Sequence, residues 1–195
     1  MAATEEQGQA ERPGYGEGKQ ALLDAAVRVV AQKGLRGLTH RAVASEAGVT
    51  QGLVAHHFGT RQTLIREAIR SAGIESIGST LTPEHNPDLG HFVDGLQAFL
   101  DETVELQAFQ YEIALEARRD AALGEEVTAL YDAYIAATGE SLEAVGIRAD
   151  DTFTRLVFAA LDGLSFQQLV YGRNAKTDAC VAELRALLAA RAAGA

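Results

Sequence analysis

Apolar residues along this 195-residue chain recur at three- and four-residue spacing, the period of an α-helix. Nowhere do Val, Ile, Thr and aromatic residues alternate with period two for long, and Ala and Leu dominate, which favours helix. The pattern therefore predicts an all-α fold. The first helix is expected over about residues 18–33, with an apolar face made of Leu22, Ala25, Ala26, Val29 and Val30.

Two short helices are predicted next, over about 39–47 and 50–56. Thr39 and Thr50 are good N-caps, because a threonine hydroxyl accepts a hydrogen bond from a free N–H of the first turn. Each cap has an apolar residue before it and another at the fourth helical position, the spacing of a hydrophobic staple. Gly48 separates the two helices, and two capped helices joined by a glycine turn are typical of a helix-turn-helix.

The rest of the chain continues in helices, and we expect about nine in all. A connector with two prolines, 80–89, interrupts them. Pro87 is well placed as the first residue of the helix that follows it. The remaining helices are expected at about 60–79, 108–119, 121–144, 150–171 and 176–192.

The stretch from Leu38 to Phe58, together with Arg61 and Leu64, resembles the N-terminal DNA-binding domain of the TetR family of transcriptional regulators. The resemblance covers about residues 18–66. Many members have Tyr where this chain has Ala55, and Lys where it has Arg61. Further matching residues are Ala25-Ala26, Gly34, Thr39, Val43-Ala44, Ala47-Gly48-Val49, Gly52 and His57.

The resemblance implies a domain plan. Residues 1–15 are expected to be a disordered arm, and residues 16–66 a helix-turn-helix DNA-binding domain whose fourth helix continues to about residue 79. Residues 80–195 are expected to form a helical ligand-binding and dimerisation domain, with the last two helices pairing with those of a second subunit. Ordinary packing within one chain is the alternative for these two helices.

DNA contacts are expected from the helix-turn-helix. The N-terminus of the second helix offers free N–H groups to a phosphate, with Arg41 as a charged partner. On the third helix, Gln51 has the geometry to pair with adenine, and Leu53 to meet a thymine methyl group. The candidate DNA-contacting residues are Thr39, His40, Arg41, Thr50, Gln51, Gly52, Leu53, His56, His57 and Arg61.

The net charge of −10 argues against DNA binding, but the distribution of the charges along the chain does not. Residues 15–70 carry a net charge of +4, whereas residues 71–195 carry −12. A basic N-terminal block on an acidic body attracts phosphates at one end only and helps to impose one docking orientation.

The DNA-binding residues do not account for the second domain. Aromatic and polar residues on its apolar faces are typical of a small-molecule pocket. The candidate lining residues are Phe92, Phe99, Tyr111, Tyr134, Phe158, Asp162 and Gln167. Each has plain core packing as its alternative.

Signals for other classes of protein are weak. No metal-ligand spacing, phosphate loop or paired catalytic residue is found, so we expect no enzyme activity, metal or cofactor. The single cysteine, Cys180, is expected to be buried and fits a reducing compartment. The first 16 residues lack the apolar run of a signal peptide, and no run of about 18 apolar residues predicts a membrane span.

These observations together predict a cytoplasmic, homodimeric regulator, most simply a repressor. A small-molecule effector would release it from a palindromic double-stranded DNA operator. The alternative is a helical-bundle ligand carrier or enzyme that does not bind DNA.

Overall fold

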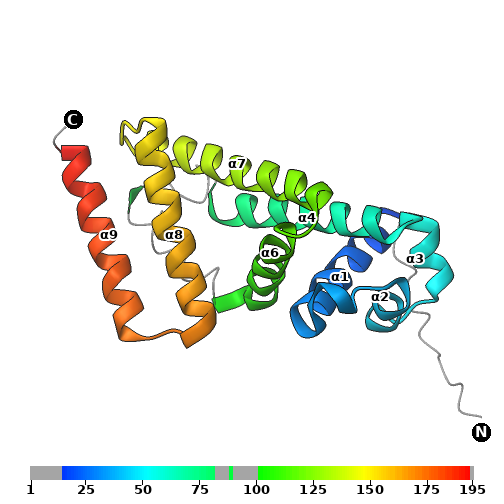
Figure 1. Ribbon diagram of the computed structural model, residues 1–195. Coiled ribbons are helices and arrows are strands. Elements are labelled where there is room, and N and C mark those ends of the chain that lie inside the picture. The colour runs from blue at the N-terminus through cyan, green and yellow to red at the C-terminus, as the bar shows by residue number, and fades with distance from the viewer. Residues whose placement is uncertain (1–14, 82–87, 90–100, 194–195) are drawn as a thin grey trace, which may run out of the picture.

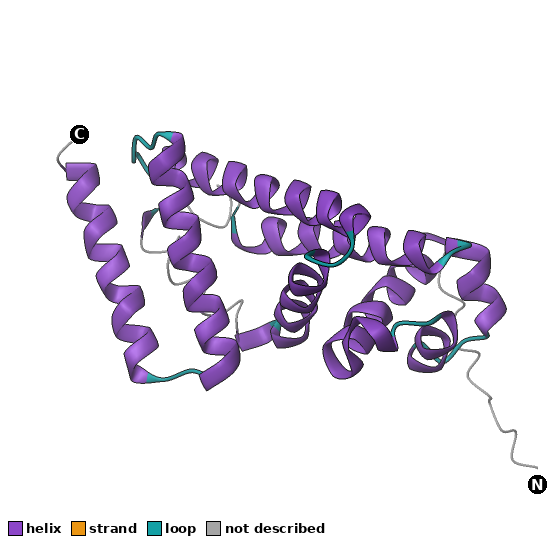
Figure 2. Cartoon of the chain, viewed as in Figure 1, coloured by secondary structure: helices purple, strands orange, loops and turns teal. Residues whose placement is uncertain are grey.

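The computed structural model describes residues 15–81, 88–89 and 101–193. That part of the chain is built from helices and the loops between them (Figures 1 and 2). The helices are α1 (Tyr15–Gly37), α2 (His40–Glu46), α3 (Gln51–Phe58), α4 (Arg61–Thr80), α6 (Val104–Ala117), α7 (Ala121–Ala144), α8 (Asp151–Tyr171) and α9 (Ala175–Ala193).

The predicted caps of the helix-turn-helix are present. The Thr39 hydroxyl accepts from the Ala42 N–H at 3.1 Å, and that of Thr50 accepts from the Leu53 N–H at 3.4 Å. The predicted end of the first helix at Gly34 is a break rather than a stop. Gly34 has φ 67°, a conformation that favours glycine, and one further helical turn follows it.

One core joins the DNA-binding helices to the second half of the chain. The predicted apolar face of α1 is fully buried, and it packs both on the helix-turn-helix and on α6. Phe109 and Ile113 of α6 belong to the same buried cluster as Val43, Val54 and Phe58. The orientation of α2 and α3 is therefore tied to α4 and α6.

A second core lies between the end of α7, α8 and α9, at the opposite end of the molecule from α3 (Figure 1). Large apolar side chains of these last helices are found at the surface. Leu156 of α8 is 64 % exposed and Leu187 of α9 is 61 % exposed. Cys180 is also exposed, which contradicts its predicted burial, because it lies on the outward face of α9.

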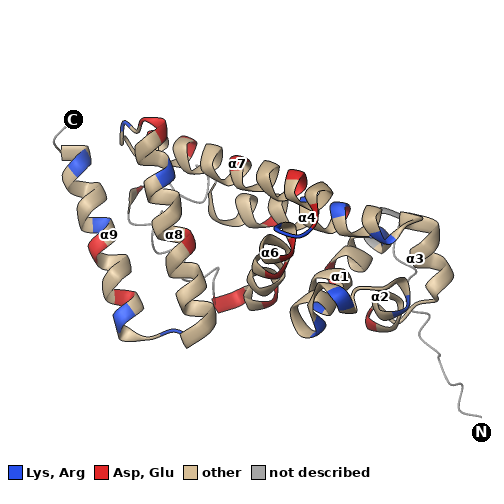
Figure 3. Cartoon of the chain, in the orientation of Figure 1, with Lys and Arg blue, Asp and Glu red and all other residues tan. Residues whose placement is uncertain are grey.

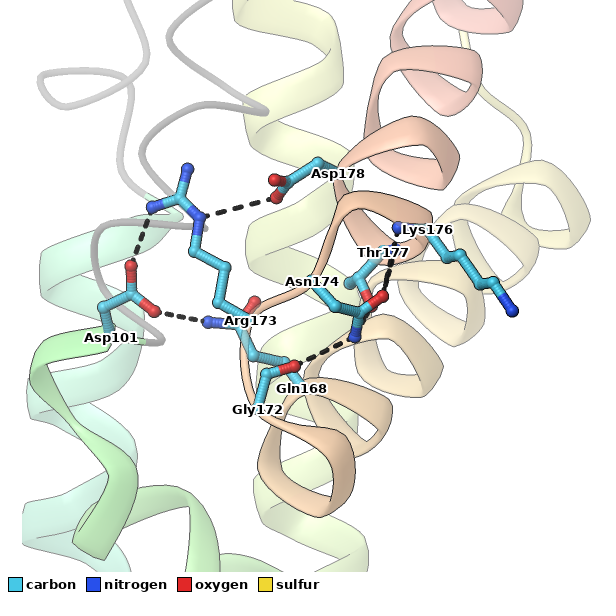
Figure 4. Close-up of polar contacts among 8 residues, drawn as sticks. All are labelled: Asp101, Gln168, Gly172, Arg173, Asn174, Lys176, Thr177 and Asp178. Carbon is cyan, nitrogen blue, oxygen red and sulfur yellow. Dashed lines mark hydrogen bonds and ion pairs between the residues drawn. The ribbon is translucent and has the colours of Figure 1, made fainter.

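The turn between α8 and α9 is fixed by polar contacts (Figure 4). Asp101 accepts from Gln168 Nε2 at 2.8 Å and from Arg173 at 2.9 Å, and so ties this turn to the segment before α6. Arg173 also pairs with Asp178. The Asn174 carboxamide oxygen accepts from the N–H groups of Lys176 and Thr177, as an N-cap does.

Some predictions fall outside the described residues and stay predictions. They concern the disordered arm, most of the proline connector and the helix after Pro87, and with it the pocket candidates Phe92 and Phe99.

The shared core generates a stability prediction. Ile113 is 1 % exposed, whereas Leu115, on the same helix, is 62 % exposed. Ile113→Ala should lower the free energy of unfolding by about 2–5 kcal/mol through lost burial and a residual cavity. Leu115→Ala should change it by less than about 0.5 kcal/mol. Urea denaturation followed by circular dichroism measures both, and equal effects would contradict the packing described.

Candidate DNA-binding surface and effector pocket

The predicted DNA-contacting residues gather on one surface, formed by the start of α2, the outward face of α3 and the start of α4. Eight of the ten are exposed, and His40 and His57 are half-buried. Between them, Val54 and Phe58 turn inward and hold α3 on its core. Such a helix, exposed along one side and anchored along the other, has the form required to enter a major groove.

Arg61 has a role that sequence reasoning missed. Its Nε donates to the Leu38 carbonyl at 2.7 Å, and one terminal nitrogen donates to the Leu35 carbonyl at 2.5 Å. These carbonyls belong to the last turn of α1 and the link to α2, so Arg61 anchors the start of α4 to both. The side chain stays exposed, and a phosphate contact remains a prediction.

Charges are distributed as the sequence indicates (Figure 3). Acidic side chains gather on α6 and the segment before it, whereas α3 carries none. Three ion pairs join the helices around the DNA-binding end. They are Arg28–Glu46 at 2.8 Å, Lys19–Glu67 at 2.5 Å and Arg70–Glu126 at 3.1 Å.

A pocket of about 70 Å³ lies among α4, α6, α7 and α8. Ring pairs form one wall. Phe158 stacks on Tyr134 at 5.9 Å between ring centres and meets Tyr131 edge-on at 5.7 Å. The lining residues are Ser76, Thr80, Leu81, Gln107, Gln110, Tyr111, Leu130, Tyr131, Tyr134, Phe158, Leu161, Asp162 and Ser165.

Polar atoms in the pocket are paired with one another. The Tyr111 hydroxyl lies 3.0 Å from the Asp162 carboxylate and 2.9 Å from the Asp162 carbonyl, and Gln110 donates to the Tyr134 hydroxyl at 2.5 Å. Burial raises the pKa of Asp162, although the bond from Tyr111 acts against this rise. Burial also raises the pKa values of Tyr131 and Tyr134 to about 12, so both phenols are neutral at physiological pH.

Four predicted lining residues, Tyr111, Tyr134, Phe158 and Asp162, therefore meet in one pocket. The prediction that Gln167 lines the pocket is wrong, because this residue lies on the exposed face of α8. The next residue, Gln168, points inward and donates to Asp101. Sequence reasoning missed Tyr131, Gln107 and Gln110. Spacing was a usable signal for two of them, because Tyr131 lies three residues before Tyr134 and Gln107 four residues before Tyr111, and such pairs share a helix face.

A larger groove of about 1110 Å³ is lined by α1, α4, the start of α6 and the residues just before it. It is wide open, and ionisable residues dominate its walls, among them the paired Lys19, Glu67 and Arg28. Burial and the nearby Asp24 raise the pKa of Glu75 in this groove. Its polar walls differ from the mostly apolar lining typical of a ligand site.

Within the described residues, no group of three or more His, Cys, Asp or Glu side chains is arranged to hold a metal ion. None of the helices in that part of the chain is long and apolar enough to cross a membrane.

Comparison with known proteins defines the class. Residues 22–68 match the family described as bacterial regulatory proteins, tetR family, and residues 87–193 match the tetracyclin repressor-like C-terminal domain. The chain therefore belongs to the TetR family of helix-turn-helix transcriptional regulators, as its resemblance predicted.

Two curated relatives match over about a quarter of this chain. The regulator BetI of Agrobacterium fabrum is 43 % identical over 53 residues, which is 27 % of this chain and 26 % of that protein. The repressor KstR2 of Rhodococcus jostii is 39 % identical over 49 residues, 25 % of this chain and 24 % of that protein. The chain thus aligns with about a quarter of the length of these relatives.

Solved structures match over most of the chain. A TetR-family member from Streptomyces coelicolor A3 is 32 % identical with a TM-score of 0.67, covering 88 % of this chain and 98 % of its own. The multidrug binding protein EbrR complexed with proflavin is 30 % identical with a TM-score of 0.59, covering 88 % and 99 %. A Rhodococcus sp. protein with a TM-score of 0.75 is 22 % identical, covers 90 % and 98 %, and bears on the fold alone.

The anchoring role of Arg61 generates a second prediction. Arg61→Ala should lower the free energy of unfolding by about 1 kcal/mol, because two carbonyls lose a charged donor at a partly solvated site. Arg66→Ala is the matched control, since Arg66 is exposed on the same helix and no hydrogen bond involving it is seen. Urea denaturation measures both, and an Arg61→Ala variant as stable as the control would contradict the anchor.

Proposed function

We propose that this protein is a homodimeric repressor that binds a palindromic operator through α3 and is released by a small-molecule effector. The observation that carries the proposal is the position of α4. It begins at the DNA-binding surface with Arg61 and ends at the pocket with Ser76 and Thr80. One uninterrupted helix of 20 residues, about 30 Å long, therefore touches both proposed sites.

Dimerisation is proposed through α8 and α9. Leu156, Phe166 and Val170 lie along one exposed side of α8, opposite its buried side, and Leu187 is exposed on α9. Gly163 lies on the same side of α8. A glycine inside a helix often marks a close backbone approach, but an added Cβ at Gly163 would meet nothing within 4 Å among the described residues. A second copy packed against this side would supply such an approach.

The twofold axis of such a dimer sets the form of the operator. Each subunit places one α3 in a major groove, so the two half-sites are inverted copies separated by one helical turn of DNA or more. The basic N-terminal block supplies phosphate attraction, while the acidic body disfavours other docking orientations.

Effector release follows from differential binding. A ligand that fits the pocket better in one arrangement of α4 shifts the population toward that arrangement. The two α3 helices of the dimer then no longer match the half-site spacing. EbrR was solved with proflavin and with ethidium, which supports a small-molecule role for the equivalent domain here. The coupling free energy between effector binding and DNA binding in such systems is usually about 1–3 kcal/mol.

The competing function is a helical-bundle carrier or enzyme without DNA binding. The proposal of no enzyme activity rests on the absence of paired catalytic groups among the described residues and on the regulator family. A DNA partner also implies the cytoplasm as the location.

A DNA-binding titration tests the proposal and generates a third prediction. Arg41→Ala should weaken binding to all sequences and reduce the slope of log K against log salt by about 1. Gln51→Ala should relax preference at one base pair, which is worth about 1–3 kcal/mol. Arg41 is preferred to Arg61 as the phosphate test because loss of Arg61 also loosens the α1–α4 junction.

Lys176→Ala is the control for this titration, because Lys176 is exposed at the start of α9, far from α3 (Figure 1). If Arg41→Ala and Gln51→Ala both bind genomic fragments as the control does, the docking of α3 is wrong and the carrier alternative is favoured.

The exposed side of α8 generates a fourth prediction. Leu156→Glu should convert the dimer to a monomer, because two carboxylates cannot be desolvated opposite each other across a twofold interface. Light scattering after gel filtration measures the mass. Leu115→Glu introduces the same charge at an exposed leucine of α6 and should leave the dimer intact. Two variants of equal mass would show that α8 is not the interface.

A further inference from the structure

Among the described residues that line the pocket, one side chain is acidic and none is basic. Asp162 is half-buried, and among the described lining residues there is no Lys, Arg or His. Its direct partner is the Tyr111 hydroxyl, a neutral donor. A carboxylate partly removed from water, with no cation beside it in the described part of the chain, has a negative charge that those residues do not compensate.

Aromatic rings surround this charge on two neighbouring helices. Tyr131 and Tyr134 come from α7, and Phe158 lies one turn before Asp162 on α8. Tyr131 stands at 90° to Phe158, and Tyr134 lies nearly parallel to it at 14°. All three rings line the pocket. An aromatic ring attracts a cation placed over its face through its quadrupole.

We propose that the pocket binds a compact organic cation, a substituted ammonium group, held between the Asp162 carboxylate and the rings of Tyr131, Tyr134 and Phe158. The inference rests on the proposed function, because it names the chemical class of the effector for that same pocket. The volume of about 70 Å³ favours a small headgroup over a large polycyclic ligand.

Other ligand classes fit the pocket less well. An anion would meet Asp162 without a basic residue to receive it. A neutral apolar ligand would displace water from the carboxylate and offer nothing in return, which adds to the desolvation that already raises the pKa of Asp162. A substituted ammonium matches both surfaces, because its alkyl shell contacts the rings while its charge offsets that of the carboxylate.

Calorimetric titration of the 195-residue chain with two probes of similar size tests whether the pocket selects for positive charge. Tetramethylammonium chloride is the cation, and tert-butyl alcohol is its neutral counterpart. We expect tetramethylammonium to bind and tert-butyl alcohol to bind at least about tenfold more weakly, because a charge pair at contact distance in a half-buried site is worth more than one decade.

Asp162→Asn generates the fifth prediction. It keeps the shape of the side chain and removes its charge, and should weaken tetramethylammonium binding about tenfold or more. Asp132→Asn, the same change at an exposed position of α7, should leave binding unchanged. Thermal melting by circular dichroism establishes that each variant is folded. If Asp162→Asn does not fold, Tyr131→Leu tests the aromatic half, and it too should weaken the cation selectively.

Equal binding of the two probes, no binding of tetramethylammonium, or an unaffected Asp162→Asn would overturn the inference. Operator binding of the ligand-free protein is measured separately. Retained DNA binding together with failed cation binding refutes only the ligand class. Cation binding without loss of DNA affinity supports the ligand class and refutes the effector role of the pocket.

Discussion

Burial of α4 along its inner side is the constraint on which the rest of the structure depends. Leu64 and Ile65 fix its first turns against the helix-turn-helix, and Ala68, Ile69 and Ala72 continue the same contact toward α6. Its last turns reach the pocket. A packed core shifts between discrete arrangements rather than deforming smoothly, so a displacement at one end of this helix would also move its other end. The Arg61 anchor adds a polar link to α1 at the DNA-binding end.

Much of the local structure was predictable because it is decided by neighbouring residues. The N-caps Thr39 and Thr50 and the bounds of α7 follow from capping chemistry and helical period, which act over one or two turns. Tertiary burial was less predictable. Leu156, Leu187 and Cys180 lie on helical faces whose apolar pattern is compatible with burial, but all three are exposed in this chain. An apolar pattern does not say whether the surface that covers it comes from the same chain or from another.

The residues of the pocket, too, were only partly predictable from the sequence. Tyr111, Tyr134, Phe158 and Asp162 were identifiable from residue type on apolar faces, but Gln167 and Gln168 differ by one position, and only the rotation of α8 decides which turns inward. The bonds of Arg61 to the Leu35 and Leu38 carbonyls span more than 20 residues of sequence. Every residue has a backbone carbonyl, so the sequence contains no motif that predicts such a contact.

The way α3 is held has a consequence for the evolution of binding preference. Only Val54 and Phe58 of this helix are buried, so Gln51, Leu53 and His56 contribute little to folding. Under the proposed docking of α3, exchange of these outward side chains would change which bases are recognised and leave the pocket and the proposed subunit contacts in place. A gene duplicate of a chain that works in the proposed way could therefore acquire new targets in few mutational steps while it kept the same effector.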